Sequence, residues 1–310
     1  MRTHRHGAAY DGMCALEYCV LIKPGGDPIK HIDFMIFGND GRQNALAEAI
    51  RADGYRTLFW PRECDLYKHG QAVGDEKGPV RIALLPMPLF DEENRLRIEG
   101  MEEAGLLRIL ETADLVIGGR IPAEFSAAAA ERGIRMIDYS LREDFAISNA
   151  LTTAEAAIEI AMHNRKSVLS GAKALVIGFG RIGRLLAHRL SALGVQVTVS
   201  ARKAEDFAWI RAYGYVCADT RQLSQLDSYE MIFNTVPAPV FGGEQLAKTR
   251  QDVLLIDLAS VPGGIDRYHA TLLGRRVIWA LSLPGKYAPD TAARCAADSI
   301  YTILMEENYG

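Results

Sequence analysis

Short apolar runs alternate with segments of helical periodicity from residue 31 onward. In the first half of the chain, the apolar runs predict buried strands and the periodic segments predict helices. The strands are expected at 32–37, 55–60, 80–85, 115–117 and 135–137, and the helices at 44–52, 99–111 and 122–131. Strands that alternate with helices form parallel sheets joined by right-handed crossovers. The pattern therefore predicts a flavodoxin-like α/β domain over residues 31–150.

The same alternation continues over residues 171–285 and predicts a second parallel α/β domain. Its strands are expected at 174–177, 195–200, 231–234, 253–258 and 276–280, and its helices at 182–193 and 204–213. A last helix is expected at 291–306, within a C-terminal segment at 286–310 that packs back on the first lobe. Two lobes agree with the length of 310 residues, which is typical of about two domains.

A linking helix is expected between the two lobes. The sequence TTAE at 152–155 matches a capping box, in which a hydroxyl accepts a hydrogen bond from the first turn and a glutamate reaches back. This motif predicts a long helix from Thr152 to about Asn164, inside a linking segment at 151–170. The length and position of this helix suggest a spine between the lobes.

A glycine-rich motif follows the apolar strand at 174–177 and opens the next helix. Its sequence is GFGRIG, and another strand follows that helix. In such a strand–turn–helix–strand unit, the motif predicts a dinucleotide-binding Rossmann site. Gly178 permits the tight turn, Gly180 lets the pyrophosphate approach the backbone, and Gly183 lets helix and strand pack closely. The candidate cofactor loop is Gly178, Phe179, Gly180, Arg181, Ile182 and Gly183.

The end of the second Rossmann strand indicates which dinucleotide binds. NAD sites usually place an Asp or Glu there, which accepts a hydrogen bond from the ribose 2′-hydroxyl. This strand ends instead in the sequence SARK. Ser200, Arg202 and Lys203 could all donate hydrogen bonds to a 2′-phosphate. The sequence therefore favours NADP over NAD, although Arg202 and Lys203 would also suit a solvated turn.

Two further strand ends are expected beside the nicotinamide half of the cofactor. Ligands in open α/β sheets lie beyond the carboxyl ends of the strands. Asn234 and Thr235 end one strand and could hold a ribose or the carboxamide. Asp257 ends the next strand, and the sequence leaves open whether it contacts the cofactor or is a buried acceptor for a turn.

Composition and charge narrow the range of partners. The net charge is −4, so no polyanion-binding surface and no nucleic-acid partner are expected. No apolar run is long enough to span a membrane, and the N-terminus lacks the pattern of a secretory signal. The cysteines are scattered and form no Cys-x-x-Cys pair, which is typical of reduced thiols. We therefore expect a cytoplasmic protein.

Residues 1–30 lack a clear period and predict a poorly ordered extension. His4 and His6 lie within it and could bind a metal. Two histidines near a terminus are weak grounds for a metal centre, however, because a stable site needs more ligands than these. We therefore expect no metal.

Several motifs together resemble the dipicolinate synthase family, specifically its A subunits, from about Asp33 to the end of the chain. The most specific are IDLASVPGG at 256–264 and LPGKYAP at 283–289, because the glycine-rich loop is shared with many dehydrogenases. The other matching segments are GNDGRQ at 38–43, GGRIP at 118–122, TAE at 153–155, VIGFGRIG at 176–183, SARK at 200–203 and FNTVPA at 233–238. Family members often have Lys where this chain has Arg120, and Pro where it has Thr152.

This resemblance implies an NADP-dependent oxidoreductase that oxidises dihydrodipicolinate, or its hydrated precursor, to dipicolinate in sporulation. It also implies that a flavoprotein-like B subunit is a partner. The other expected partners are a small dicarboxylate substrate and further copies of the chain, which would form a homo-oligomer. The departures from the family pattern leave the exact substrate open.

Hydride transfer needs a dry cleft between lobes, and a dicarboxylate substrate needs cations in that cleft. Arg42 and Arg120 each follow a strand of the first lobe, and Lys286 lies in the Pro-Gly-Lys loop at the lobe junction. We expect Arg42 and Arg120 to bind the substrate carboxylates, and Lys286 to orient the substrate or assist proton transfer. Surface or interlobe ion pairs are the alternative for each. The acid or base stays unassigned: Asp40, Asp257 or solvent could take the proton.

Two other functions stay open on the sequence alone. A 2-hydroxyacid-dehydrogenase-like enzyme would share the two lobes and the loop, but the second lobe lacks an evident Arg, Glu and His set for activating a carbonyl. A non-catalytic nucleotide-binding subunit of a two-subunit complex would keep the cofactor loop without turnover.

Overall fold

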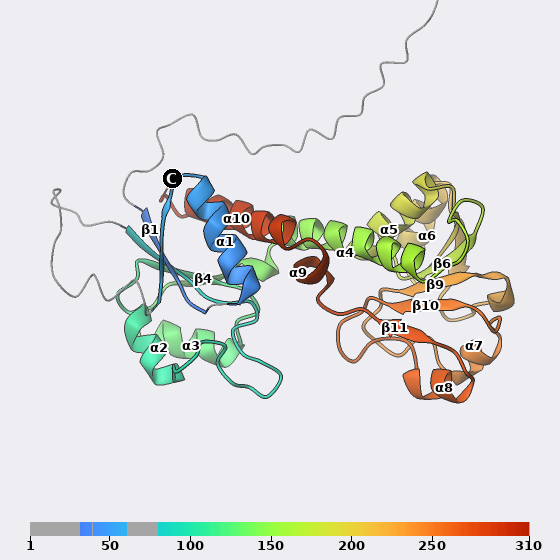
Figure 1. Cartoon of the computed structure of the whole chain (residues 1–310), viewed down its shortest axis with the longest axis horizontal. Helices are drawn as coiled ribbons and strands as arrows, with labels where there is room; N and C mark the ends of the chain where they lie inside the picture. The colour runs from blue at the N-terminus through green and yellow to red at the C-terminus, as the bar shows by residue number, and fades with distance from the viewer. Residues whose placement is uncertain (1–31, 39, 61–79, 310) are drawn as a thin grey trace, which may run out of the picture.

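The computed structural model describes residues 32–38, 40–60 and 80–309. Figure 1 shows these residues as two α/β lobes joined by helices. The predicted N-terminal extension at 1–30, with its two histidines, lies outside the described residues.

Five parallel strands form the sheet of the first lobe. They are β1 (Ile32–Ile36), β2 (Arg56–Phe59), β3 (Val80–Leu84), β4 (Leu115–Gly118) and β5 (Met136–Asp138). Their spatial order is β2-β1-β3-β4-β5, which is the flavodoxin-like order. The predicted fold class of this lobe is confirmed.

Helices cover both faces of this first sheet (Figure 1). One face carries α1 (Gly41–Ala52) and α10 (Pro289–Glu306), and the other carries α2 (Glu103–Leu110) and α3 (Ala123–Glu131). Ile36 of β1 shares an apolar core with Leu46 of α1 and Ile300 of α10. Met35 points to the opposite face and joins the core that contains Leu106 of α2. Because both faces are buried, the strands are mostly apolar, although Asp33 in β1 and Arg81 in β3 interrupt the apolar runs.

Six parallel strands form the sheet of the second lobe. They are β6 (Lys173–Ile177), β7 (Gln196–Ala201), β8 (Val216–Asp219), β9 (Met231–Asn234), β10 (Leu254–Asp257) and β11 (Val277–Trp279). The order β11-β10-β9-β6-β7-β8 is that of a Rossmann fold, so the predicted Rossmann architecture is confirmed. The edge strand β8 was not predicted.

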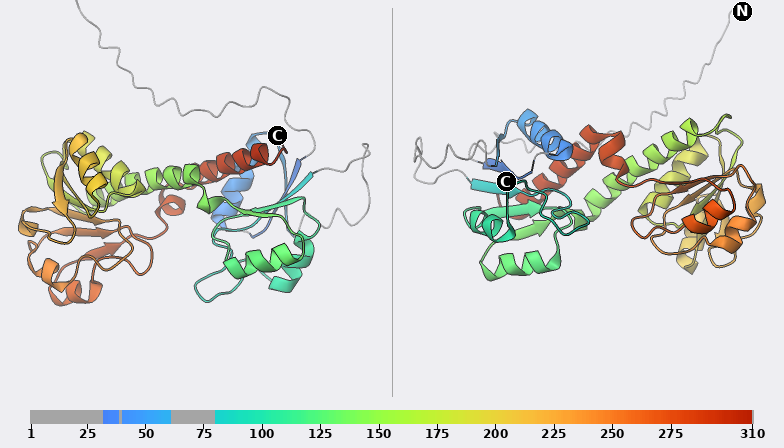
Figure 2. Two further views of the ribbon diagram at one scale, coloured as in Figure 1. Left: turned by 180° about the vertical axis from the view of Figure 1, so that it is seen from behind. Right: turned by 60° about the horizontal axis from the view of Figure 1, so that its bottom comes forward.

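A long helix, α4 (Glu143–His163), joins the two lobes (Figures 1 and 2). It begins at Glu143 rather than at Thr152, so the predicted capping box is wrong. Thr153 is buried inside the helix, where its hydroxyl donates to the carbonyl of Asn149 at 2.8 Å. The linking segment therefore starts earlier in the chain than its predicted boundary.

Helices also cover both faces of the second sheet. Beside α4, they are α5 (Arg181–Ala192), α6 (Ala204–Ala212), α7 (Gly243–Ala247) and α8 (Arg267–Leu272). Ala157 of α4 and Leu186 of α5 share one apolar core, together with Val176 of β6. Leu246 of α7 and Ala270 of α8 belong to the core on the other face. Residues at the carboxyl ends of β6, β7 and β9 line one cavity together with residues of the first lobe.

The chain returns to the first lobe through a short helix, α9 (Leu283–Tyr287), and then α10 (Figure 2). Helix α10 begins at Pro289, and its residues Ala293, Ala297 and Ile300 are buried in the core beside α1. The lobes are therefore joined twice, by α4 and by the segment that leads into α10.

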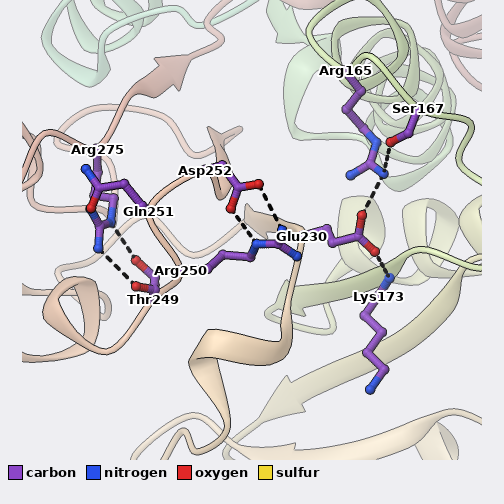
Figure 3. Close-up of polar contacts among 9 residues, drawn as sticks. All are labelled: Arg165, Ser167, Lys173, Glu230, Thr249, Arg250, Gln251, Asp252 and Arg275. Carbon is purple, nitrogen blue, oxygen red and sulfur yellow. Dashed lines mark hydrogen bonds and ion pairs between the residues drawn. The ribbon is translucent and has the colours of Figure 1, made fainter.

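A polar network fixes the far end of α4 to the Rossmann sheet (Figure 3). Arg165 lies just beyond the helix, its side chain is nearly buried, and it donates to the Glu230 carboxylate at 2.9 Å. Glu230 also accepts from the backbone amide of Lys173, at the start of β6, at 3.3 Å. The hydrogen bond from Arg165 is the main reason why the pKa of Glu230 lies below its usual value. This network lies at the amino ends of the strands, opposite the cofactor loop.

Candidate functional site

A cavity of about 510 Å³ lies between the lobes, at the carboxyl ends of the Rossmann strands. We call it the interlobe cavity. Its walls in the second lobe are 178–182, 201–203, Asp206, Thr220 and 235–237. Its walls on the other side are Met87, Arg120, Ser140, Phe145, Ala146, Asn149 and Ala150. The predicted cofactor loop and one predicted substrate residue therefore share one space.

The glycine-rich loop forms one wall of this cavity, and its geometry fits a dinucleotide. Gly178 has φ +100°, a conformation that favours glycine, and a β-carbon at Gly183 would collide with the carbonyl oxygen of Gly178. Gly180 faces open space. It is also the N-cap of α5 and supplies no side-chain hydrogen bond to the helix amides. The amides of the first turn are therefore available to an anion such as a pyrophosphate.

The residues predicted to hold the 2′-phosphate separate into two groups. Arg202 and Lys203 are exposed and line the interlobe cavity. Ser200 is fully buried and does not line it, because its hydroxyl oxygen accepts from Thr220 at 3.0 Å. The predicted direct role of Ser200 is therefore corrected: it supports Thr220. Thr220 does line the cavity, and the sequence reasoning missed it.

An acidic residue that the sequence reasoning also missed lies at this end of the cavity. Asp206 is in the first turn of α6 and lines the cavity. A guanidinium nitrogen of Arg184 lies 3.4 Å from its carboxylate. Arg184 is itself held by the ring and the carbonyl of Phe179, to which its Nε donates at 3.0 Å. Arg184 therefore offsets a negative charge that would otherwise repel a 2′-phosphate.

Two of the three residues predicted beside the nicotinamide lie beneath the cavity and do not line it. Asn234 is fully buried and donates to the Asp257 carboxylate at 2.7 Å. Asp257 is also buried, and it accepts from the amides of Gly264 and Ile265 at 2.8 and 3.0 Å. Asp257 is therefore a buried acceptor for a turn, which is one of the two roles left open for it. Asn234 is also buried and does not line the cavity, so its predicted contact with the cofactor is corrected. Thr235 does line the cavity.

A second cavity, of about 590 Å³, is lined by three arginines, Arg42, Arg97 and Arg120. We call it the arginine pocket. Arg120 lines both cavities and therefore stands at their boundary. The other residues around the pocket are Asp40, Gly41, Asn44, Ala45, Glu48, Pro88, Ser282, Gly285, Pro289 and Asp290. The structure thus brings together both predicted substrate arginines and adds Arg97, which no sequence pattern singled out.

Arg120 has a left-handed backbone, with φ +55°. Residues other than glycine adopt this conformation at a cost, so the surroundings must hold it. The amide of Arg120 donates to the hydroxyl of Ser140 at 2.9 Å and to the carboxylate of Asp138 at 3.2 Å. Among the described residues, the side chain of Arg120 has no hydrogen-bonding or ionic partner. Such a strained residue with a free cation is typical of a ligand-binding position.

Arg42 lies in the first turn of α1, where its Nη1 donates to the carbonyl of Met87 at 3.3 Å. No carboxylate within the described ranges pairs with it. Tyr139 is buried nearby, and burial raises the pKa of its hydroxyl, while the charge of Arg42 acts in the opposite direction. Tyr139 therefore stays protonated at neutral pH and is no candidate for a base.

The structure places Lys286 outside both cavities, and its predicted role stays a prediction. This residue is exposed on α9 and lines neither cavity, whereas its neighbour Gly285 lines the arginine pocket. Asp40 lines that pocket but is engaged as the N-cap of α1 and as the partner of Arg97. None of the histidines within 80–309 lines either cavity. No side-chain acid or base is therefore assigned.

Over the part of the chain that the structure describes, no group of three or more His, Cys, Asp or Glu side chains is arranged to hold a metal ion. In the same part, no helix has both the length and the hydropathy that a membrane span requires.

Residues 132–260 match the family described as the D-isomer specific 2-hydroxyacid dehydrogenase, NAD binding domain. The chain is also similar to the A subunit of dipicolinate synthase from Bacillus subtilis (strain 168), with 31% identity over 193 residues. That alignment covers 62% of this chain and 65% of the relative, which is slightly less than two thirds of its length.

Solved structures show the same similarity over more of the chain. The structure of the A subunit of dipicolinate synthase from Bacillus halodurans is 25% identical, with a TM-score of 0.72, and the match covers 88% of this chain and 97% of that one. The corresponding Bacillus subtilis structure is 24% identical, also with a TM-score of 0.72, over 89% of this chain and 95% of that one. The resemblance to this family is confirmed. The second lobe is an NAD-binding domain, so the cofactor class is a nicotinamide dinucleotide.

Proposed function

We propose that the chain is an NADP-dependent oxidoreductase that converts dihydrodipicolinate, or its hydrated precursor, to dipicolinate. The interlobe cavity carries this proposal, because the glycine-rich loop lines it on one side and Arg120 on the other. A dinucleotide on the loop and a carboxylate on Arg120 would share one space, as hydride transfer requires. On the strength of the resemblance, we place the reaction in the cytoplasm and in sporulation.

The preference for NADP rests on Arg202 and Lys203. Both are exposed cations that line the cavity beyond the end of β7, where the ribose of a dinucleotide lies in a Rossmann fold. Charge-assisted hydrogen bonds from these groups would favour a 2′-phosphate. Asp206 is the feature that argues for NAD, but its carboxylate is paired with Arg184, so it does not outweigh Arg202 and Lys203.

The reaction that we propose removes two hydrogens from a dihydropyridine ring. The substrate would lose one hydride and one proton, the proton to solvent, so that its ring becomes aromatic; the hydrated precursor would also lose one water. Bound NADP supplies the hydride acceptor. Arg120 and Arg42 would bind and orient the two carboxylates. Met87 and Phe145, which also line the interlobe cavity, would exclude water from the reacting ring.

The proposed partners are further copies of this chain and a flavoprotein-like second subunit. The name of the Bacillus subtilis relative, which is one subunit of a synthase, supports the second of these. It also favours another candidate function, in which the chain binds nucleotide without catalysing a reaction alone. The family match over 132–260 favours a further candidate, a 2-hydroxyacid dehydrogenase.

A turnover assay separates these candidates. The purified chain is mixed with NADP⁺ and dihydrodipicolinate, with and without a dipicolinate synthase B subunit, and NADPH is followed by its absorbance. D-lactate replaces dihydrodipicolinate in a matched reaction. We expect NADPH from dihydrodipicolinate without the B subunit, and none from D-lactate.

Other results of this assay would overturn the proposal. Turnover of D-lactate in place of dihydrodipicolinate would identify a 2-hydroxyacid dehydrogenase. Cofactor binding without any turnover until the B subunit is added would identify a nucleotide-binding subunit.

A further inference from the structure

The arginine pocket receives its three guanidinium groups from three separate segments of the first lobe. Arg42 comes from the first turn of α1, Arg97 from the loop that follows β3, and Arg120 from the turn after β4. Because Arg120 also lines the interlobe cavity, a ligand that contacts Arg120 can extend from one cavity into the other. The two cavities are therefore candidates for the two ends of one substrate.

Asp40 contacts two of these arginines, Arg42 through its backbone amide and Arg97 through its guanidinium. One oxygen of its carboxylate caps α1 by accepting from the amides of Arg42 and Gln43, each at 3.0 Å. The other oxygen accepts from Arg97 at 2.9 Å. The Arg42 side chain in turn donates to the carbonyl of Met87, at the start of the loop that carries Arg97. The loop is thus attached to the start of α1 at two points.

The ion pairs around the arginine pocket leave two of its arginines, Arg42 and Arg120, able to bind an anion. The carboxylate of Asp40 is paired with Arg97 and with the helix amides, so its charge is already satisfied. Glu48 and Asp290 also line the pocket, from α1 and α10. In the described part of the chain, neither is paired with Arg42 or Arg120. Arg42 is partly buried and therefore lacks the carboxylate partner that such arginines usually have, and the exposed guanidinium of Arg120 is also unpaired within the described residues.

We propose that the arginine pocket is the subsite for the substrate carboxylate that lies farther from the nicotinamide. Arg42 binds this carboxylate, Arg97 and Asp40 position Arg42, and Arg120 holds the carboxylate nearer to the cofactor. This assignment rests on the proposed function. It makes the enzyme selective for acids with two carboxylates, because an acid with one carboxylate leaves the arginine pocket empty.

Binding of product-like acids to the NADP⁺-loaded protein tests this assignment without turnover. Calorimetric titration compares pyridine-2,6-dicarboxylate with pyridine-2-carboxylate. We expect the wild-type protein to prefer the dicarboxylate. In Arg97→Ala and in Asp40→Asn, Arg42 is no longer held in position, so the Kd for the dicarboxylate should rise about tenfold, which corresponds to loss of the one charge-assisted contact from Arg42. The Kd for the monocarboxylate and for NADP⁺ should not change.

Two further variants complete the design. Arg95→Ala removes an arginine from the same loop that pairs with Asp91 and Glu93 and lines neither cavity, so it should bind both acids as the wild type does. Arg97→Lys keeps the positive charge and should recover part of the preference. Asn at position 40 still offers an acceptor to the helix amides, so thermal melting should show an intact fold.

The outcomes separate this inference from the function on which it rests. If the wild type prefers the dicarboxylate but Arg97→Ala and Asp40→Asn keep the full preference, the subsite is wrong and the proposed function stands. If the wild type binds neither acid, or both equally, the proposed dicarboxylate substrate is wrong, and the subsite falls with it.

Discussion

The guanidinium of Arg42 lies against the backbone of Gly285, so closely that a β-carbon at Gly285 would collide with it. Arg42 belongs to α1 of the first lobe, and Gly285 to α9, at the junction between the lobes. The contact thus ties the arginine pocket to the segment through which the chain returns from the Rossmann lobe. It also explains why a glycine suits the Pro-Gly-Lys loop.

Replacing Gly285 with alanine should displace Arg42. The backbone of Gly285 is outside the left-handed region, so the substitution is not strained by its φ angle. We expect the Kd for pyridine-2,6-dicarboxylate to rise about tenfold, through loss of one charge-assisted contact, while NADP⁺ affinity is unchanged. Gly105→Ala, on α2 with ordinary contact distances, is the control. Unchanged dicarboxylate binding in Gly285→Ala would remove Arg42 from the substrate site.

The glycines of the cofactor loop should respond in two different ways. In Gly183→Ala, the new methyl group would collide with the carbonyl of Gly178, so both thermal stability and NADPH affinity should fall. In Gly180→Ala, the methyl group enters open space, so the fold should stay intact while the approach of the pyrophosphate is blocked. Calorimetry and thermal melting measure both effects. Normal NADPH binding by Gly180→Ala would place the pyrophosphate elsewhere.

Discrimination between the two dinucleotides should depend on Arg202 and not directly on Ser200. Arg202→Ala should weaken NADPH binding about tenfold and leave NADH binding unchanged, because only NADPH carries the 2′-phosphate. Ser200→Ala should change the ratio of the two affinities much less, since its hydroxyl is buried and engaged with Thr220. If Arg202→Ala weakens NADPH and NADH binding equally, Arg202 contacts a group that both dinucleotides carry and not the 2′-phosphate.

The Arg165–Glu230 pair should make stability depend on pH. The pKa of Glu230 is lowered in the folded protein, chiefly by the hydrogen bond from Arg165. Its contribution is therefore present above the usual pKa of a glutamate and is lost as pH falls through the lowered value. Glu230→Gln should lower the free energy of unfolding by about 1–2 kcal/mol at neutral pH.

The measurement for this pair is chemical denaturation at neutral and acidic pH. The difference between Glu230→Gln and the wild type should shrink as the wild-type carboxylate becomes protonated. Glu244→Gln, which removes an exposed helix ion pair with Lys248, should cause no measurable change. A difference for Glu230→Gln that does not vary with pH would show that charge plays no part.

The sequence predicted the fold and the cofactor loop because both depend on local patterns. Buried parallel strands are mostly apolar on both faces, and the glycine spacing follows from the close approach of Gly178 and Gly183. The start of α4 was placed too late, because TTAE satisfies the capping pattern in the middle of a helix. The edge strand β8 was missed, because VCAD is short and Val216 is exposed.

The site was predicted less well, because it depends on where side chains point. Ser200, Asn234 and Asp257 do stand at strand ends, but hydrogen bonds to buried neighbours turn them away from the cavity. Arg97 lies in a loop, and Asp206 opens a helix where acids are common, so neither position carries a local signal.

The most direct test of the central claim is the steady-state oxidation of dihydrodipicolinate by Arg120→Ala, because Arg120 lines both cavities. NADPH formation gives KM, and calorimetry gives the Kd for NADPH. If the two cavities hold cofactor and substrate side by side, KM for dihydrodipicolinate should rise about tenfold or more, and the Kd for NADPH should stay at its wild-type value. A wild-type KM in a folded Arg120→Ala protein would contradict this account.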